Sequence, residues 1–293
     1  MINSPLNYTG NKFKLLNQLI PYLKETDTFI DVFAGSGLVG LNSKSKNIVL
    51  NDNNGITINL LNYFKDNDSE LIIKEMDKII KKYGFTDSYR KGLHYYPEEK
   101  HEGLSKFNKG PFNKLKEDYN NKPSTIKLFA LIIYGFNHYI RFNSKGIYNV
   151  PVGKVDYSKS LREKTIEYCD AFKNKNIIIS QKDFRDNSLY ENLNAMYYFD
   201  PPYLITQAPY NATWTEKEEI DLLNKLDELD KKGFKFALSN VIESNGKVNE
   251  ILKDWSKKYN VIYLNRKYLN SNYRKKNITI AQEVLIINYE VEV

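Results

Sequence analysis

Four consecutive residues, Asp200-Pro201-Pro202-Tyr203, place two prolines between an acid and an aromatic ring, directly after the apolar run 196–199. Proline fixes its own φ and donates no hydrogen bond, so two in succession form a stiff corner. Such a corner keeps a carboxylate and a backbone carbonyl as acceptors in fixed positions, which suits a site that must orient a donor group. An ordinary loop could use the same corner, so the rest of the chain has to decide.

A second candidate site lies in residues 29–40, FIDVFAGSGLVG, which have the pattern of a strand, a tight glycine turn and the start of a helix. Gly35 and Gly37 would let the backbone approach a ligand closely. Asp52 ends the next apolar run, about 20 residues later, where an acid can accept hydrogen bonds from ribose hydroxyls. Asp31 would repel a pyrophosphate, and neither a GxGxxG nor a GxxxxGK[ST] motif is present. A cationic adenosine ligand such as S-adenosylmethionine suits this acidic pocket better, with a plain tight turn as the alternative.

The elements that must position these residues are short, continuously apolar runs, which are typical of strands covered on both faces of a sheet. They span residues 29–33, 47–51, 176–180, 196–199, 234–240, 260–265 and 283–289. A helix is expected at 215–231, where Thr215 and Glu218 match a capping box and Ile220, Leu223 and Leu226 have helical spacing. Alternation of strands and helices predicts a doubly wound, mainly parallel, seven-stranded α/β sheet.

The middle of the chain, residues 62–156, is helical and charged in pattern and lacks strands of that kind. We interpret it as an inserted domain, with residues 1–61 and 157–293 forming the other domain. Within the insert, residues 125–136 predict a buried helix. Residues 137–154 predict a β-hairpin that turns at Ser144-Lys145-Gly146.

The composition of the 293 residues narrows the function classes. The net charge is +7, residues 62–156 hold 17 Lys/Arg against 12 Asp/Glu, and residues 255–282 hold seven Lys/Arg and no acid. Such surfaces suit a polyanion, although a lysine-rich composition explains them equally well. Cys169 is the single cysteine and the three histidines are scattered, so we expect no disulfide framework and no bound metal. The N-terminus lacks the apolar stretch of a secretory signal, and no run is apolar enough to span a membrane.

Taken together, the motifs and their order resemble the Dam family of adenine DNA methyltransferases, in its α-type arrangement, over most of the chain. PLNYTGNKFKLLNQLIP (5–21) resembles the family's N-terminal cofactor motif, residues 29–37 its glycine loop, residues 200–203 its catalytic tetrapeptide and residues 273–289 its closing segment. The resemblance implies S-adenosylmethionine as the cofactor. It also implies these cofactor-binding residues: Tyr8, Gly10, Lys12, Asp31, Phe33, Gly35, Gly37, Asp52, Asp183, Phe184 and Asp200.

For the catalytic tetrapeptide, the resemblance implies methyl transfer to the N6 amino group of an adenine that is flipped out of the duplex. The lone pair of that amino group is delocalised into the ring. The Asp200 carboxylate and the Pro201 carbonyl would each accept one N–H, direct the lone pair at the methyl group and stabilise the developing positive charge. Pro202 completes the stiff corner, and Tyr203 would offer a flat face to the base; for Tyr203 a plain core role is the alternative.

The resemblance further implies that the insert recognises double-stranded DNA through its hairpin. The expected DNA-binding residues are Asn7, Phe136, Asn137, His138, Tyr139, Arg141, Asn143, Lys145, Arg274 and Lys275. Arg141 could make a bidentate contact with guanine, or instead pair with a local acid. Asn7 and His138-Tyr139-Ile140 depart from the residues of members that read GATC. The resemblance therefore does not extend to a GATC recognition sequence.

Related functions stay open at this stage: methylation of cytosine N4 in DNA, of adenine in RNA, or of a protein glutamine, and a DNA-binding module without catalysis. Asp rather than Asn at position 200 argues against glutamine, the recognition insert favours duplex DNA over RNA, and the complete set of motifs argues for an enzyme. Cytosine C5 methylation needs a cysteine nucleophile, and Cys169 has the context of a buried helix residue. We expect a monomer in the cytoplasm of a bacterium or phage-infected cell, associated with the nucleoid, with a cognate restriction endonuclease as a further partner.

Overall fold

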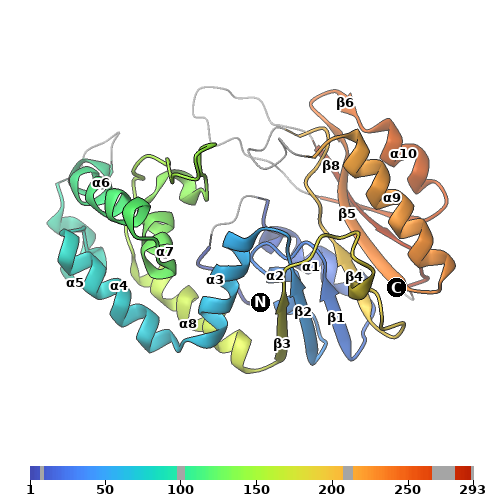
Figure 1. The fold of residues 1–293 in the computed structure, drawn as a ribbon, viewed down its shortest axis with the longest axis horizontal. Helices are drawn as coiled ribbons and strands as arrows, with labels where there is room; N and C mark the ends of the chain where they lie inside the picture. Colours follow the sequence, from blue (N-terminus) through green and yellow to red (C-terminus); the bar gives the residue numbers. More distant parts are fainter. Residues whose placement is uncertain (7–9, 98–102, 207–213, 266–280, 292–293) are drawn as a thin grey trace. The chain divides into compact units, whose positions relative to one another are not determined.

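The computed structural model describes residues 1–6, 10–97, 103–206, 214–265 and 281–291, and the chain divides into two compact units (Figure 1). The first unit comprises residues 1, 12–58 and 175–293, and the second comprises residues 2–11 and 59–174. The second unit starts close to the expected start of the insert at 62. It continues past the expected end at 156, because helix α8 (Lys159–Lys173) packs against α4 (Ser69–Tyr83).

The first unit is built on a sheet with the strand order β3-β2-β1-β4-β5-β8-β7, and the short β6 pairs with β5. Strands β3, β2, β1, β4 and β5 are parallel, whereas β8 is antiparallel to β5 and β7. This confirms the expected mainly parallel sheet. The strands are β1 (Thr28–Asp31), β2 (Asn47–Asn51), β3 (Asn176–Ser180), β4 (Met196–Phe199), β5 (Lys235–Ser244), β6 (Lys247–Val248), β7 (Asn260–Leu264) and β8 (Ala281–Ile287).

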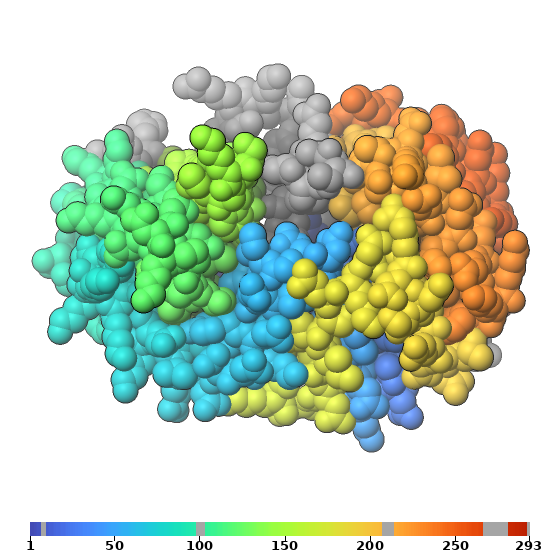
Figure 2. All heavy atoms as spheres, viewed as in Figure 1, coloured from blue at the N-terminus to red at the C-terminus, as the bar shows by residue number. Residues whose placement is uncertain are grey.

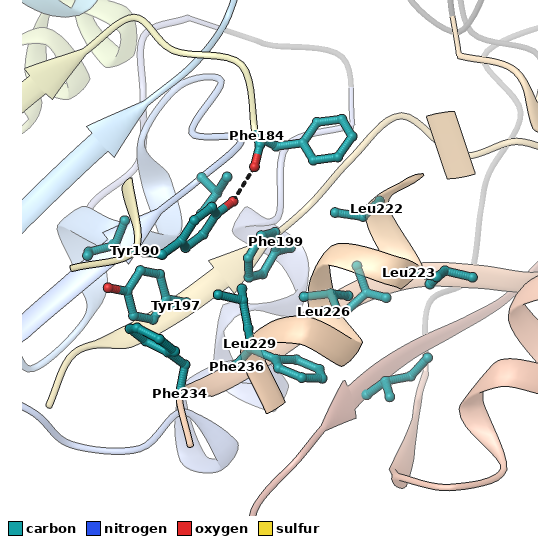
Figure 3. Close-up of a cluster of buried hydrophobic side chains, with 14 of the residues drawn as sticks. Phe184, Tyr190, Tyr197, Phe199, Leu222, Leu223, Leu226, Leu229, Phe234 and Phe236 are labelled. Carbon is teal, nitrogen blue, oxygen red and sulfur yellow. Dashed lines mark hydrogen bonds between the residues drawn. The ribbon is translucent and has the colours of Figure 1, made fainter. Parts of the chain in front are cut away.

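Successive side chains of a strand point to opposite faces of the sheet, so an apolar strand contributes to a buried cluster on each face. In β4, Tyr197 and Phe199 join one buried cluster, while Met196 and Tyr198 join the other. Leucines of α9 (Glu216–Lys231) fill the first cluster (Figure 3), and leucines of η1 (Phe13–Leu15) and α1 (Leu16–Leu19) fill the second. The remaining helices of the unit are η2 (Ile20–Tyr22), α2 (Leu38–Asn42), η5 (Asn187–Leu189) and α10 (Glu250–Ser256).

Helix α9 confirms the expected start and end of a helix in this region. The capping box of Thr215 and Glu218 is formed, and the helix ends at Lys231 before Gly233, whose φ is +85°. Its buried face differs from the expected one, because Leu222, Leu223, Leu226 and Leu229 are buried whereas Ile220 is 44% exposed. Figure 2 shows the outer surface of this helix in orange.

The second unit is mainly helical. Helix α7 (Thr125–Tyr134) is buried along almost its whole length, as expected, between α4 and α6 (Ser105–Asn121). In segment 137–154 the expected turn is formed, because Phe142 and Tyr148 make an isolated bridge and the amides of Asn143 and Asn149 donate to the carbonyls of Ile147 and Arg141 at 2.9 and 3.3 Å. A second isolated bridge joins Gly135 to Val152, and the two arms form no continuous ladder. The other helices are α5 (Ser88–Lys91), η3 (Leu93–Tyr95) and η4 (Phe136–His138), and α3 (Gly55–Asp66) spans the boundary between the units. None of the helices in the described ranges combines the length and apolarity needed to cross a membrane.

Candidate active site at the strand ends

Three acids of the first unit stand at the ends of three neighbouring strands. Asp31 is the last residue of β1, Asp52 follows β2 and Asp200 follows β4. The strands are parallel and adjacent in the order β2-β1-β4, so their carboxyl ends lie at one edge of the sheet. The chain order reverses between β1 and β4, and such a switch point is where open α/β sheets bind ligands.

The glycine loop after β1 is held by Asp52. Its Oδ2 accepts a hydrogen bond from the Gly35 amide at 2.9 Å, and its Oδ1 accepts one from the Asn54 amide at 2.9 Å. Gly35 and Gly37 have φ values of +51° and +67°, which L side chains rarely adopt. A carboxylate offers about four acceptor positions, so these two bonds leave capacity for hydroxyl donors.

Asp31 is 1% exposed, and its two carboxylate oxygens differ. Oδ2 accepts a hydrogen bond from the Gly40 amide at 3.2 Å, whereas the buried Oδ1 has no partner in the described part of the chain. A buried acceptor without a partner is costly, because it has lost its hydrogen bonds to water. A ligand that offers a hydrogen-bond donor would satisfy this oxygen.

Burial, and then the nearby Asp200 carboxylate, raise the pKa of Asp31 from 3.8 to about 8. The folded protein therefore keeps a proton that the unfolded chain has lost, and the stability from this proton is complete below about pH 4 and lost as the pH rises to about 8. Relative to Asp31→Asn, we expect the wild-type free energy of unfolding to fall by up to about 1.4 kcal/mol per pH unit across this window. Urea unfolding of both ligand-free proteins at several pH values measures this difference, and a constant difference would contradict it.

Asp200 is held by a lysine from the N-terminal segment. Lys12 Nζ lies 2.6 Å from Oδ1 and 2.7 Å from Oδ2 of Asp200, and 2.6 Å from the Tyr203 hydroxyl. The Tyr203 hydroxyl also lies 2.9 Å from Asp200 Oδ1. Burial raises the pKa of Asp200, and Lys12 opposes this shift. Lys12, expected to bind the cofactor, thus contacts Asp200 and Tyr203, both expected to be catalytic.

Sequence reasoning did not single out Glu283, which completes this group from β8. Its side chain is fully buried, with Oε1 3.2 Å from the Tyr203 hydroxyl and 3.5 Å from Lys12 Nζ. Because β8 is antiparallel, its beginning lies at the edge where the parallel strands end. The available signal was an acid as the first residue of the apolar run 283–289, where burial requires a partner for its charge.

Asn51 is a second residue that sequence reasoning missed. It is fully buried at the end of β2, and its Nδ2 donates to the carbonyls of Val32 and Lys182 at 2.9 and 3.0 Å. Its Oδ1 accepts a hydrogen bond from the Lys182 amide at 3.0 Å. Asn51 thereby ties the start of the glycine loop to the segment that carries Asp183 and Phe184.

An aromatic cluster stands beside the glycine loop. Phe33 contacts Phe184 and Trp214, with ring centroids 5.6 and 5.8 Å apart, and Phe184 also contacts Trp214 at 5.8 Å. Phe184 is held from behind by the Tyr190 hydroxyl, which donates to its carbonyl at 2.5 Å (Figure 3). Asp183 is exposed and pairs with Arg185 at 3.2 Å. Phe33 and Phe184, both expected to bind the cofactor, are therefore neighbours.

In the second unit, the segment expected to contact bases has a strained backbone. Asn137 and His138 have φ values of +51° and +54°, and a non-glycine residue in this region costs of order 1–3 kcal/mol. Hydrogen bonds directly before the turn hold it to residues 151–153, from the Phe136 amide to the Pro151 carbonyl at 2.8 Å and from the Gly153 amide to the Tyr134 carbonyl at 2.7 Å. The Phe136 side chain is left 42% exposed.

Three further residues of this segment take part in local bonds. Arg141 is exposed and donates from Nε to Asn149 Oδ1 and from Nη2 to the Asn149 carbonyl, both at 2.9 Å. Its local partner is thus an amide rather than an acid. Asn143 Oδ1 accepts from the amides of Lys145 and Ile147 at 3.0 Å and closes the turn. Tyr139 packs edge-on against the Phe136 ring.

Four residues expected to bind the cofactor or DNA lie outside the described residues: Asn7, Tyr8, Arg274 and Lys275. Gly10 is described and has a φ of +85°, which explains a glycine at this position. Across the described ranges, no three His, Cys, Asp or Glu side chains gather in a way that could hold a metal ion. Cys169 is buried, which raises the pKa of its thiol to about 12.

Comparison with known proteins places this geometry in a family context. A family described as D12 class N6 adenine-specific DNA methyltransferase matches residues 8–270. The chain is 36% identical to the type II methyltransferase M.FokI of Planomicrobium okeanokoites, over 98% of this chain and 43% of that protein. It is 34% identical to the modification methylase StsI of Streptococcus sanguinis, over 99% and 43%. It is 26% identical to the DNA adenine methylase of Escherichia coli K12, over 71% and 66%. The chain therefore spans less than half the length of the first two relatives.

Proposed function

Because the chain belongs to the D12 class of N6 adenine-specific DNA methyltransferases, we propose that it methylates the N6 amino group of an adenine in double-stranded DNA. The observation that carries the proposal is the position of Asp200. It stands in a rigid corner at the end of β4, next to Asp31 at the end of β1, at the switch point of the sheet. A donor bound by the glycine loop and an amino group bound by Asp200 would meet there.

S-adenosylmethionine, the proposed cofactor, would supply an activated methyl group on a sulfonium cation. The partnerless Oδ1 of Asp31 supports binding of a cationic group of this ligand. The remaining acceptor capacity of Asp52 supports binding of its ribose hydroxyls, and the rings of Phe33 and Phe184 support packing against its adenine.

The residues of the tetrapeptide would then prepare the target amino group. The Asp200 carboxylate and the Pro201 carbonyl accept one N–H each, which directs the nitrogen lone pair out of the ring plane. Both acceptors are fixed before the substrate arrives, so they stabilise the growing positive charge without reorganising. After transfer the nitrogen is cationic and loses its proton easily, so Asp200 need not act as a strong base. Tyr203 supports the corner through its hydroxyl and is proposed to contact the extruded base with its ring.

We propose that residues 62–156 recognise DNA, and that residues 1–61 and 157–293 bind the cofactor and carry out catalysis. The strained turn at Asn137 and His138 supports this assignment, because sparsely populated backbone conformations persist where the surrounding structure enforces them and are frequent at functional sites. The exposed Phe136 ring beside this turn is suited to insertion into a base stack.

Arg141→Ala should relax sequence preference at one base pair. If this guanidinium contacts a guanine, its loss should cost about 1–3 kcal/mol of discrimination there. Lys145→Ala is the matched variant, because an exposed lysine at the loop tip is suited to a phosphate and should weaken binding to all sequences alike. Methylation of a randomised DNA library, read out by sequencing, compares both variants with wild type. Unchanged preference in Arg141→Ala would remove this residue from base recognition.

Transfer of a tritiated methyl group to unmethylated DNA, followed by nucleoside analysis, tests the proposed function. The label is expected in N6-methyladenine. Label in N4-methylcytosine would assign the related cytosine activity instead, and absence of label from every DNA tested would refute DNA methylation by this chain.

M.FokI is named a type II methyltransferase and StsI a modification methylase. By extension, we propose that this chain protects DNA from a cognate restriction endonuclease and acts as a monomer on the DNA of a bacterial or phage-infected cytoplasm. Expression of the chain should make host DNA resistant to an endonuclease that recognises the methylated sequence.

A further inference from the structure

We propose that Glu283 is a positioning residue for methyl transfer, which competes with Asp200 for Lys12 and Tyr203 and so keeps an acceptor of Asp200 available to the target amino group. This inference rests on the proposed function and adds to it a residue outside the catalytic tetrapeptide. Glu283 would not touch the substrate. It would act through the two side chains that it shares with Asp200.

The first argument is the burial of an acid. Glu283 is fully buried in β8, and the next two residues, Val284 and Leu285, are equally buried and apolar. An unpaired carboxylate in such a place is very costly, so its partners must compensate. The described partners are Lys12 Nζ at 3.5 Å and the Tyr203 hydroxyl at 3.2 Å. Both also contact Asp200, so the two acids share a cation and a hydroxyl.

The second argument is the number of protons that can be shared. The Tyr203 hydroxyl has one hydrogen, and two carboxylate oxygens lie within its reach, Asp200 Oδ1 at 2.9 Å and Glu283 Oε1 at 3.2 Å. When Tyr203 donates to Glu283, Asp200 Oδ1 loses that donor and gains capacity for the amino group. When Tyr203 donates to Asp200, that capacity is reduced. Glu283 therefore sets how often Asp200 is ready to accept the substrate hydrogen.

The same competition applies to the charge of Lys12. A cation that lies 2.6 and 2.7 Å from the two oxygens of Asp200 weakens them as acceptors. Glu283 is a second anion near Lys12, so it takes part of the attraction that Lys12 would otherwise exert on Asp200 alone. Glu283→Gln would leave the volume nearly unchanged but remove this anion, so Lys12 and the Tyr203 proton would both turn to Asp200. We expect the rate of methyl transfer to fall about tenfold, the effect of losing one charged hydrogen-bond partner.

The pH profile separates this role from a purely structural one. Among the residues that the structure describes, the titratable groups around Asp200 include Lys12 from the N-terminal segment, Tyr203 after β4, Glu283 on β8, Asp31 on β1 and Tyr198 on β4. Burial raises the pKa of Asp200, Lys12 lowers it and Glu283 raises it. Removal of the Glu283 charge should therefore shift the acidic limb of the rate profile to lower pH, in addition to lowering the plateau.

Glu219 offers a matched control in the same unit. It is also a fully buried acid, and its described partners are Trp214 Nε1 at 2.7 Å, Asn240 Nδ2 at 3.1 Å and Asn249 Nδ2 at 2.9 Å. Glu219→Gln removes a buried carboxylate without changing the group around Asp200. Its acidic limb should stay at the wild-type pH, whatever its plateau rate.

The experiment measures single-turnover methyl transfer against pH for wild type, Glu283→Gln and Glu219→Gln. The inference is supported if Glu283→Gln alone has a lower plateau rate and an acidic limb of the rate profile that is shifted to lower pH. A limb that stays in place, or that moves equally in Glu219→Gln, would overturn it. If the wild-type chain itself transferred no methyl group, the proposed function would be refuted. The competition between Glu283 and Asp200 would then be decided by an NMR titration that does not depend on activity.

That second measurement needs neither activity nor a folded Gln variant. Wild-type protein carrying aspartate labelled with ¹³C at the side-chain carboxyl is titrated by NMR, and Asp200→Asn identifies the Asp200 signal. Two carboxylates that share a cation and a proton titrate in coupled steps, so a two-step curve for Asp200 is expected. A single-step curve that is indifferent to Glu283→Asp would refute the competition.

Discussion

Asp200→Ala is expected to lower the rate of methyl transfer by about 10³-fold or more, while the affinity for S-adenosylmethionine stays nearly unchanged. The loss has two causes. The acceptor that orients the amino group disappears, and so does the negative charge that stabilises the developing cation, and one preorganised group of this kind is commonly worth about 10²–10³ in rate. Single-turnover transfer of a tritiated methyl group to DNA and calorimetric cofactor binding measure the two effects separately.

Asp254→Ala is the matched control for this substitution. Asp254 lies on α10, where it is exposed and forms a surface ion pair with Lys257 at 2.7 Å. Its loss should leave both transfer and cofactor binding at wild-type values. Near-normal turnover of Asp200→Ala would show that the tetrapeptide does not have the catalytic role proposed for it.

Lys12→Met is expected to destabilise the protein by about 3–5 kcal/mol at neutral pH, because it removes the cation that the buried carboxylates of Asp200 and Glu283 both contact. Lys12 is 3% exposed, so water cannot replace it. The loss should diminish as the pH falls. Burial raises the pKa of Asp200, and without Lys12 to oppose that shift the group protonates more readily and no longer needs a counter-ion. Urea unfolding at several pH values measures the free energy of unfolding.

Lys44→Met is the corresponding control. Lys44 pairs with Glu25 on the surface, where both side chains are more than half exposed, and such pairs contribute about 0–1 kcal/mol. A cost of Lys12→Met no larger than that of Lys44→Met, or a cost independent of pH, would show that Lys12 does not compensate the buried acids.

Much of the fold could be predicted from local patterns. The runs 47–51, 176–180 and 196–199 are strands β2, β3 and β4 over the same residues. β4 is buried along its whole length, as a continuously apolar run predicts, whereas β3 lies at the edge of the sheet and leaves Ile178 63% exposed. The capping box at Thr215 fixed the start of α9 for an equally local reason. The buried face of that helix was less predictable. Two faces were compatible with the spacing of its apolar residues, and packing against the sheet selected the one with Leu222 and Leu229.

Segment 137–154 shows what local patterns leave out. Ser144-Lys145-Gly146 predicted a turn, and Gly146 has a φ of +71° there. The arms beside it pair at the bridge Phe142↔Tyr148 and through backbone hydrogen bonds on either side of it, but they form no continuous ladder. The Arg141 side chain also bonds to Asn149 across the loop, and Asn137 and His138 adopt left-handed conformations. Neither feature is visible in a short-range pattern, since both depend on the residues that face them across the loop.

By itself, the sequence determined the strands, the glycine loop and the acids at their ends, because each of these depends on residues close together in the chain. Only the tertiary structure brought Lys12, Asp200 and Glu283 together. Lys12 and Asp200 are nearly 200 residues apart in the chain. Asp200 follows the parallel strand β4, whereas Glu283 lies on the antiparallel strand β8. The physical reason is the sheet order, which brings the beginning of β8 to the edge where β4 ends. Once buried there, both acids contact Lys12, whose charge compensates theirs.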